Sequence, residues 1–159
     1  MNENYDYIIY TDGAYSQIHD EGAFAYVMLD GNGNEIRRFV SKISHETNNR
    51  AELKAIITAI YHLPLNAKRV KVISDSQYAL YTLSGEWSRK TNLELFDVFE
   101  NVMRAHEGLT IEWEWVRGHN GNKYNEICDQ LCNDMLGYDA NIEFAKYKKT
   151  KRKWNETTY

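Results

Sequence analysis

The sequence has one proline, two cysteines and no long apolar run. The scarcity of proline excludes a proline-rich linker. No apolar stretch approaches the ~20 residues that a membrane-spanning helix needs, so no membrane role is expected. The first six residues are polar and acidic rather than the apolar core of a signal peptide. Together these absences predict a cytoplasmic protein.

The two cysteines are Cys128 and Cys132, four residues apart. This spacing places both thiols on one face of a helix, which does not suit a disulfide bond between them. They are typical of the reduced, half-buried thiols of a cytosolic protein. No second pair of cysteines exists to complete a zinc site, so zinc is not expected.

The chain has 159 residues, which suits one domain, and a net charge of −4. The charge is unevenly spread, because six of the 19 Lys and Arg residues lie in 146–153 and leave 13 basic residues against 23 acidic ones. The acidic excess of the body indicates a site that attracts cations. The basic tail either contacts polyanions or is a solvated chain end.

Hydrophobic periodicity predicts nine elements in the order β-β-β-α-β-α-α-β-α. Strands are expected at about 7–10, 23–29, 35–43, 68–74 and 109–116, and helices at about 50–63, 75–84, 93–106 and 124–136. The fourth strand follows a helical crossover, so it should pair in parallel with the first. The fold class is therefore α/β, with a mixed five-stranded sheet flanked by helices. We expect one domain at 1–138 and a basic tail or helix at 139–159.

Four acidic residues stand out by their positions. Asp12 and Asp75 follow the first and fourth strands, so both should project from the same carboxyl edge, where open α/β sheets bind ligands. Glu52 lies in the first turns of the long helix, and Asp129 lies on the last helix. Each also has a purely structural interpretation. Asp12-Gly13 is a common turn, either aspartate could be an N-cap, Glu52 could form a capping box with Asn49, and Asp129 could be solvated.

A cluster of such carboxylates requires a compensating cation. Two like charges ~4 Å apart repel by about 4 kcal/mol at an effective dielectric constant near 20. Oxygen ligands of this kind suit Mg²⁺ or Mn²⁺. Two such ions promote phosphodiester hydrolysis by activating water and stabilising the leaving oxygen.

Four segments of the chain resemble motifs of the ribonuclease H type 1 family. They are Tyr10–Gly13, Thr47–Leu53, Ser74–Tyr78 and Trp115–Asp129. The most specific is His119-x-Gly121-x-x-x-Asn125-Glu126-x-Cys128-Asp129. Their order and approximate spacing agree with the family across about residues 5–136, and the predicted order of elements is that of a ribonuclease H-like fold.

The resemblance implies an endonuclease that cuts the RNA strand of an RNA–DNA hybrid and leaves 3′-hydroxyl and 5′-phosphate ends. It implies four metal-ligand carboxylates, which are Asp12, Glu52, Asp75 and Asp129. These would hold two Mg²⁺ ions with the substrate, and Mn²⁺ would substitute. It also implies that His119, in a glycine-flanked loop, assists proton transfer or product release, a role that suits an imidazole.

The same resemblance assigns substrate contacts. The implied substrate-binding residues are Gly13, Thr47, Asn48, Asn49 and Gln77. The three amides would contact the minor groove of the hybrid, where a 2′-hydroxyl both donates and accepts hydrogen bonds. Gly13 would let the RNA backbone come close, and Thr47 would belong to a pocket for a DNA phosphate. Helix capping is the alternative for Asn48 and Asn49.

The sequence departs from the family pattern in two regions. Many members have a Gly/Pro-rich loop after the first motif, where this chain has the polar segment 15–21 and only Gly22. Many bacterial members carry a basic, Trp-rich handle between the two middle helices, whereas this chain has only the short segment 87–92. Trp87, Arg89 and Lys90 form a reduced version, and the tail at 146–153, with its neighbour Trp154, is a second source of phosphate contacts. The expected partner is an RNA–DNA hybrid bound by a monomer. A binding module that no longer cuts and a nuclease for double-stranded RNA remain alternatives.

Overall fold

The computed structural model describes residues 4–140, so the basic tail at 146–153 and Trp154 lie outside the described residues. The elements are β1 (Tyr7–Ser16), β2 (Glu21–Asp30), β3 (Glu35–Ser44), α1 (Asn48–Tyr61), β4 (Arg69–Ser74), α2 (Gln77–Ser84), α3 (Leu93–Ala105), β5 (Thr110–Trp115) and α4 (Lys123–Leu136). The predicted order of elements is confirmed. No helix within residues 4–140 is long and apolar enough to cross a membrane.

The five strands form one mixed sheet in the order β3-β2-β1-β4-β5. The first three strands pair antiparallel, while β4 pairs in parallel with both β1 and β5. The parallel pairing of β1 and β4 is the one that the helical crossover predicts. The strand that contains Asp12 and the strand that Asp75 follows are therefore neighbours in the sheet.

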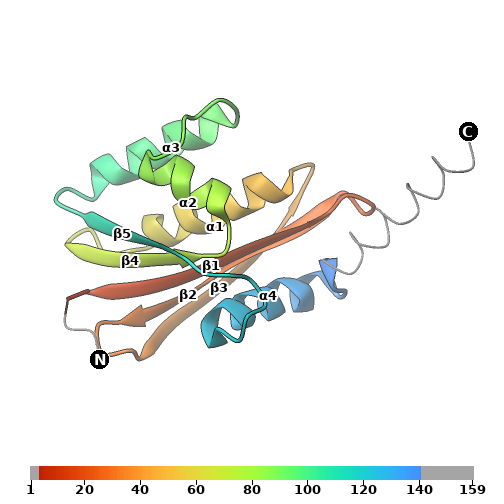
Figure 1. The fold of residues 1–159 in the computed structure, drawn as a ribbon, viewed down its shortest axis with the longest axis horizontal. Helices are drawn as coiled ribbons and strands as arrows, with labels where there is room; N and C mark the ends of the chain where they lie inside the picture. Colours follow the sequence, from red (N-terminus) through yellow and green to blue (C-terminus); the bar gives the residue numbers. More distant parts are fainter. Residues whose placement is uncertain (1–3, 141–159) are drawn as a thin grey trace, which may run out of the picture.

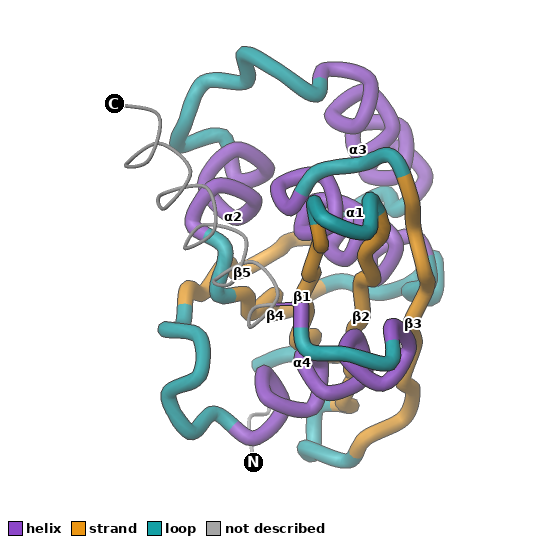
Figure 2. The backbone as a smooth tube through the Cα atoms, turned by 90° about the vertical axis from the view of Figure 1, so that its right-hand side faces the viewer, coloured by secondary structure: helices purple, strands orange, loops and turns teal. Residues whose placement is uncertain are grey.

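Helices cover both faces of this sheet. Figures 1 and 2 show α1, α2 and α3 on one side and α4 on the other. Along β2 the side chains alternate, so that Tyr26 and Met28 pack under α1 while Val27 and Leu29 pack against α4. A strand buried on both faces needs a continuous apolar run, which β2 has from Ala23 to Leu29.

The first strand is longer than the sequence predicts. Asp12 and Gly13 lie inside β1 rather than after its end, and Tyr15 and Ser16 are buried. The expected end of this strand at about residue 10 is therefore wrong, as is the interpretation of Asp12-Gly13 as a turn. The reason is the pairing with β2, which continues to Ser16 opposite Glu21 and leaves only residues 17–20 as a turn.

The hydrogen bonds at the starts of α1 and α2 show which residues are N-caps. Thr47 caps α1 by accepting a hydrogen bond from the Arg50 N–H, and Ser76 caps α2 by accepting one from the Ala79 N–H. Asp75 is therefore not the N-cap of α2. Glu52 lies five positions beyond the N-cap of α1, so it does not complete a capping box, which places the acid three residues after the cap.

Candidate active site

Asp12 and Asp75 lie close together at the point where the pairing of β1 with β4 ends. Their parallel ladder ends at the pair formed by Tyr10 and Ile73, and each aspartate lies two residues beyond that pair. β4 stops at Ser74, whereas β1 continues along β2. The indole Nε1 of Trp115 donates a hydrogen bond of 3.0 Å to the backbone oxygen of Asp75, which fixes the backbone of that residue.

Glu52 reaches the same point from α1. This helix approaches β1 at Gly13, where an added Cβ would lie 2.7 Å from the Ala51 carbonyl carbon and 2.7 Å from the Glu52 nitrogen. No other amino acid fits so close a contact without moving the helix. The absence of a side chain at Gly13 thus lets Glu52 lie beside the strand, where its side chain is buried.

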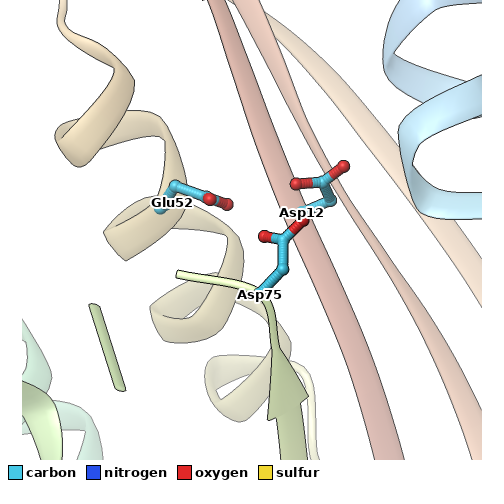
Figure 3. Close-up of side chains that lie close together, drawn as sticks. All are labelled: Asp12, Glu52 and Asp75. Atoms are coloured by element: carbon cyan, nitrogen blue, oxygen red, sulfur yellow. The ribbon is translucent and has the colours of Figure 1, made fainter. Parts of the chain in front are cut away.

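Three carboxylates meet at this place. One oxygen from each of Asp12, Glu52 and Asp75 lies within 4.8 Å of the other two. Figure 3 shows the three side chains converging from α1, from β1 and from the end of β4. They line a cavity of about 280 Å³, whose other lining residues are Gly13, Asn48, Gly118, His119 and Asp129.

The electrostatics of the cluster disfavour three bare charges. Burial, followed by the negative charges of Asp75 and Asp129, holds the pKa of Asp12 well above its ordinary value. A hydrogen bond of 2.9 Å from the Gly13 N–H opposes that shift. Burial and the charges of Asp12 and Asp75 likewise raise the pKa of Glu52.

The donor set fits a divalent cation. Among the described residues, Glu52 Oε1 is a buried acceptor with no hydrogen-bond partner. An unsatisfied buried polar atom costs about 1–3 kcal/mol, and more if it is charged. Three convergent carboxylates offer only oxygen ligands, which Mg²⁺ and Mn²⁺ prefer. A bound cation would satisfy the orphaned oxygen and lower the raised pKa values.

Asp129 belongs to the cavity wall, outside the group of three. Two thiols hold α4 against β1: Cys128 Sγ lies 3.4 Å from the Tyr10 carbonyl oxygen and Cys132 Sγ lies 4.0 Å from that of Asp12. Both cysteines are free and fully buried on one face of α4. This packing brings the half-buried Asp129 to the cavity.

His119 lies in the loop between β5 and α4. Its side chain is exposed and its backbone has the left-handed φ of 55°, and the residue lines the same cavity as the carboxylates. The structure therefore brings together all five predicted catalytic residues in one cavity, four of them as acids and one as an exposed imidazole.

Gly118 is a residue for which the sequence assigned no role. An added Cβ would lie 2.6 Å from Asp75 Oδ2. The loop backbone thus passes directly against the carboxylate, and only glycine leaves that oxygen in place. The signal in the sequence was the glycine beside His119, but its proximity to Asp75 depends on tertiary structure.

The predicted substrate-binding residues fall into two groups. Gly13 and Asn48 line the cavity. Thr47, Asn49 and Gln77 are exposed residues at the starts of α1 and α2 and do not line it. Asn49 follows Asn48 directly, and Gln77 follows Asp75 by two residues, so both lie close along the chain to residues that line the cavity.

The short segment that replaces the handle is only partly available to a ligand. Arg89 donates hydrogen bonds to the carbonyl oxygens of Thr82 and Leu83, at 2.9 and 3.2 Å, and pairs with Glu100 at 2.7 Å. Its guanidinium thereby satisfies the C-terminal end of α2. Trp87 is 46% exposed, so it remains the accessible aromatic residue of the segment.

Comparisons with known proteins agree with this geometry. The family model described as RNase H matches residues 4–136. A ribonuclease H of Thermoanaerobacter sp. (strain X514) is 34% identical over 149 residues, which cover 86% of this chain and 94% of that protein. A ribonuclease H of Neorickettsia sennetsu is 30% identical over 151 residues, covering 87% and 97% of the two chains. A ribonuclease HI of Synechocystis sp. is 31% identical over 134 residues, covering 77% and 82%.

Proposed function

Because this chain belongs to the ribonuclease H family, we propose that it hydrolyses the RNA strand of RNA–DNA hybrids and leaves 3′-hydroxyl and 5′-phosphate ends. The chain is a ribonuclease H enzyme, and its acidic cluster fits a divalent metal ion. The observation that carries the proposal is the convergence of Asp12, Glu52 and Asp75 within 4.8 Å around an orphaned glutamate oxygen.

The proposed metal is Mg²⁺, with Mn²⁺ as a substitute. When bound together with the substrate, two such ions would supply the Lewis acidity that activates water and stabilises the leaving oxygen. Asp12, Glu52, Asp75 and Asp129 would hold them. Asp12 is the central ligand in this proposal, because the charges of both other aspartates act on its carboxylate.

The other residues of the site act on the substrate and on protons. His119, exposed at the cavity wall, would move a proton at its imidazole or assist product release. The amides of Asn48, Asn49 and Gln77 would distinguish the RNA strand through its 2′-hydroxyl groups. Thr47 would contact a phosphate of the DNA strand.

Two further proposals concern the whole molecule. Asp12, Glu52, Asp75, Asp129 and His119 all line one cavity of this chain, so a second copy is not needed to complete the site, which supports action as a monomer. The two buried, free thiols support a cytoplasmic location, where thiols stay reduced.

The test is a cleavage assay with end-labelled RNA–DNA hybrid, double-stranded RNA and single-stranded RNA in Mg²⁺. We expect the hybrid alone to be cut, on its RNA strand, and EDTA to abolish the reaction. Asp75→Asn should lower the rate by more than about 100-fold, since even the loss of an outer-sphere partner commonly costs 10–100-fold. The matched control is Asp97→Asn, an exposed acid on α3, which should stay within twofold of wild type.

Absence of hybrid cleavage at high enzyme concentration would overturn the proposal, as would an undiminished rate in Asp75→Asn. Preferential cleavage of double-stranded RNA would instead establish the alternative substrate. Polyacrylamide gels of the labelled products, after phosphatase treatment, would also establish which end carries the phosphate.

A further inference from the structure

Tyr15 links the turn between β1 and β2 to the segment that precedes α1. It lies near the end of β1, and its side chain is only 6% exposed. Its hydroxyl group donates a hydrogen bond to Asp20 in the turn between β1 and β2. The same oxygen accepts a hydrogen bond of 3.0 Å from the backbone N–H of Glu46, in the turn before α1.

The ring of Tyr15 is held in a fixed position by the sheet. Tyr15 pairs with Gly22 across the β1–β2 ladder, and an added Cβ at Gly22 would lie 2.6 Å from Tyr15 Cδ2. The ring therefore lies directly over the glycine. Because both strands are hydrogen-bonded on either side of this pair, the hydroxyl group is a rigid anchor rather than a mobile donor.

Glu46, the residue that this hydroxyl holds, is also fixed through its side chain. Its carboxylate pairs with Arg50 and with Lys54, both on α1. The next residue, Thr47, caps α1. Asn48 follows and lines the cavity. The backbone that carries the proposed substrate contacts thus begins at a residue fixed at both its nitrogen and its carboxylate.

The turn between β1 and β2 is itself joined to the same backbone. The N–H of His45 donates to the Asp20 carbonyl oxygen at 3.4 Å, and the His45 imidazole pairs with the Asp20 carboxylate. Both residues have left-handed backbones, with φ of 49° at Asp20 and 57° at His45. Such conformations are uncommon outside glycine and persist where the surrounding contacts hold them.

We propose that Tyr15 is a positioning residue for substrate binding, which holds the turn at Glu46 and Thr47, and with it the first residues of α1, Asn48 and Asn49, against the end of β1. This inference rests on the proposed hybrid-cleaving function, because it concerns how Thr47, Asn48 and Asn49 meet the substrate. Tyr15 acts on the affinity for the hybrid and leaves the carboxylate cluster unchanged, since its hydroxyl contacts neither Asp12 nor Glu52.

The test compares Tyr15→Phe with a matched control, Tyr26→Phe. The first substitution removes only the hydroxyl that holds the start of α1. The second removes a hydroxyl that contacts His62 Nδ1 at 2.6 Å, at the C-terminal end of the same helix. For Tyr15→Phe we expect KM for the hybrid to rise about 3–10-fold, the loss of one typical hydrogen bond, with kcat within twofold. For Tyr26→Phe we expect neither to change, although both variants lose stability.

Hydrogen–deuterium exchange provides a readout that does not depend on cleavage. Without its acceptor, the Glu46 N–H is exposed to solvent, so exchange over residues 46–49 should quicken in Tyr15→Phe and not in Tyr26→Phe. An unchanged KM together with unchanged exchange would overturn the inference. A fall in kcat at constant KM would also overturn it, because that result would place the effect at the carboxylates.

If the wild-type protein did not cut hybrids, the proposed function would fall by itself. Faster exchange over residues 46–49 in Tyr15→Phe would then still support Tyr15 as the residue that holds this turn. Unchanged exchange would overturn that role as well.

Discussion

We expect the substitution Gly118→Ala to remove most of the ribonuclease activity while leaving the fold intact. The new Cβ would lie 2.6 Å from Asp75 Oδ2, 3.4 Å from Cγ and 3.5 Å from Cβ of that residue. A carbon and an oxygen in ordinary contact are about 3.3–3.6 Å apart. The carboxylate oxygen must therefore move by roughly 0.7–1 Å, and a displacement of that size at a reacting group can cost about 100-fold in rate.

The same geometry predicts a small effect on stability. The atom nearest to the new methyl group is the end of a side chain that is only half-buried, so it can rotate away. Gly118 does not have a left-handed φ, so alanine introduces no backbone strain. Alanine also reduces the conformational freedom of the unfolded chain, which favours the folded state by about 0.4–1 kcal/mol. We expect the melting temperature to change by no more than a few degrees.

The assay measures kcat/KM on the hybrid over a range of Mg²⁺ concentrations, beside thermal melting of each variant. The control is Gly85→Ala, at a glycine with φ of 90° and nothing within 4 Å of an added Cβ. Backbone strain there should cost about 1–2 kcal/mol of stability and leave kcat/KM within threefold of wild type. A folded Gly118→Ala variant with kcat/KM within threefold of wild type would refute the assigned contact between loop and carboxylate.

Three further results are expected. Mg²⁺ should raise the melting temperature relative to EDTA, because binding at 100 times Kd stabilises the folded state by about 2.7 kcal/mol. The substitution Asp12→Asn should remove this rise. A wild-type melting temperature that does not change at Mg²⁺ concentrations that support cleavage would count against the site. In EDTA, the free energy of unfolding should fall as pH rises above about 4, because the folded protein keeps protons on Asp12 and Glu52 that the unfolded chain has lost. Urea titrations at several pH values should show that this free energy depends less on pH in Asp12→Asn. A free energy of unfolding that increases over this range would contradict the raised pKa values. His119→Ala should lower kcat by roughly 100-fold with an unchanged melting temperature, since the side chain is exposed, and an unchanged kcat would exclude its role.

Local patterns predicted the elements well because local physics forms them. The apolar spacing of α1 places Leu53, Ile56 and Ile60 on its buried face, and any helix with that spacing must bury them together. The four-residue spacing of Cys128 and Cys132 likewise predicted one face of a helix, and both thiols pack against β1. Most element boundaries followed from these patterns, and the parallel pairing of β1 with β4 followed from the helical crossover between them.

Long-range pairing was beyond such patterns. Asp12 and Gly13 have low strand propensity, yet they lie in the middle of β1 because β2 pairs with them in register. Nothing near them in the sequence sets that register. Gly118 illustrates the same limit, since its role depends on a contact with Asp75, which is far away along the chain.

The position of the site follows from the mixed character of the sheet. Beyond Tyr10 the antiparallel ladder of β1 continues, whereas the parallel ladder with β4 has ended. Within residues 4–140, β1 therefore has no paired strand on its β4 side at Asp12. The helices α1 and α4, on opposite faces of the sheet, both bring acids to this position.

Holding like charges there costs about 4 kcal/mol for a pair ~4 Å apart, so each acid needs an anchor of its own. Leu53, fully buried beside Glu52, and Cys128, fully buried beside Asp129, are such anchors, and burying an apolar side chain of leucine size contributes about 1.5–3 kcal/mol. The apolar core next to these two acids thus offsets part of the repulsion in the metal-free site. A substitution such as Leu53→Ala should then loosen the carboxylate cluster without touching it.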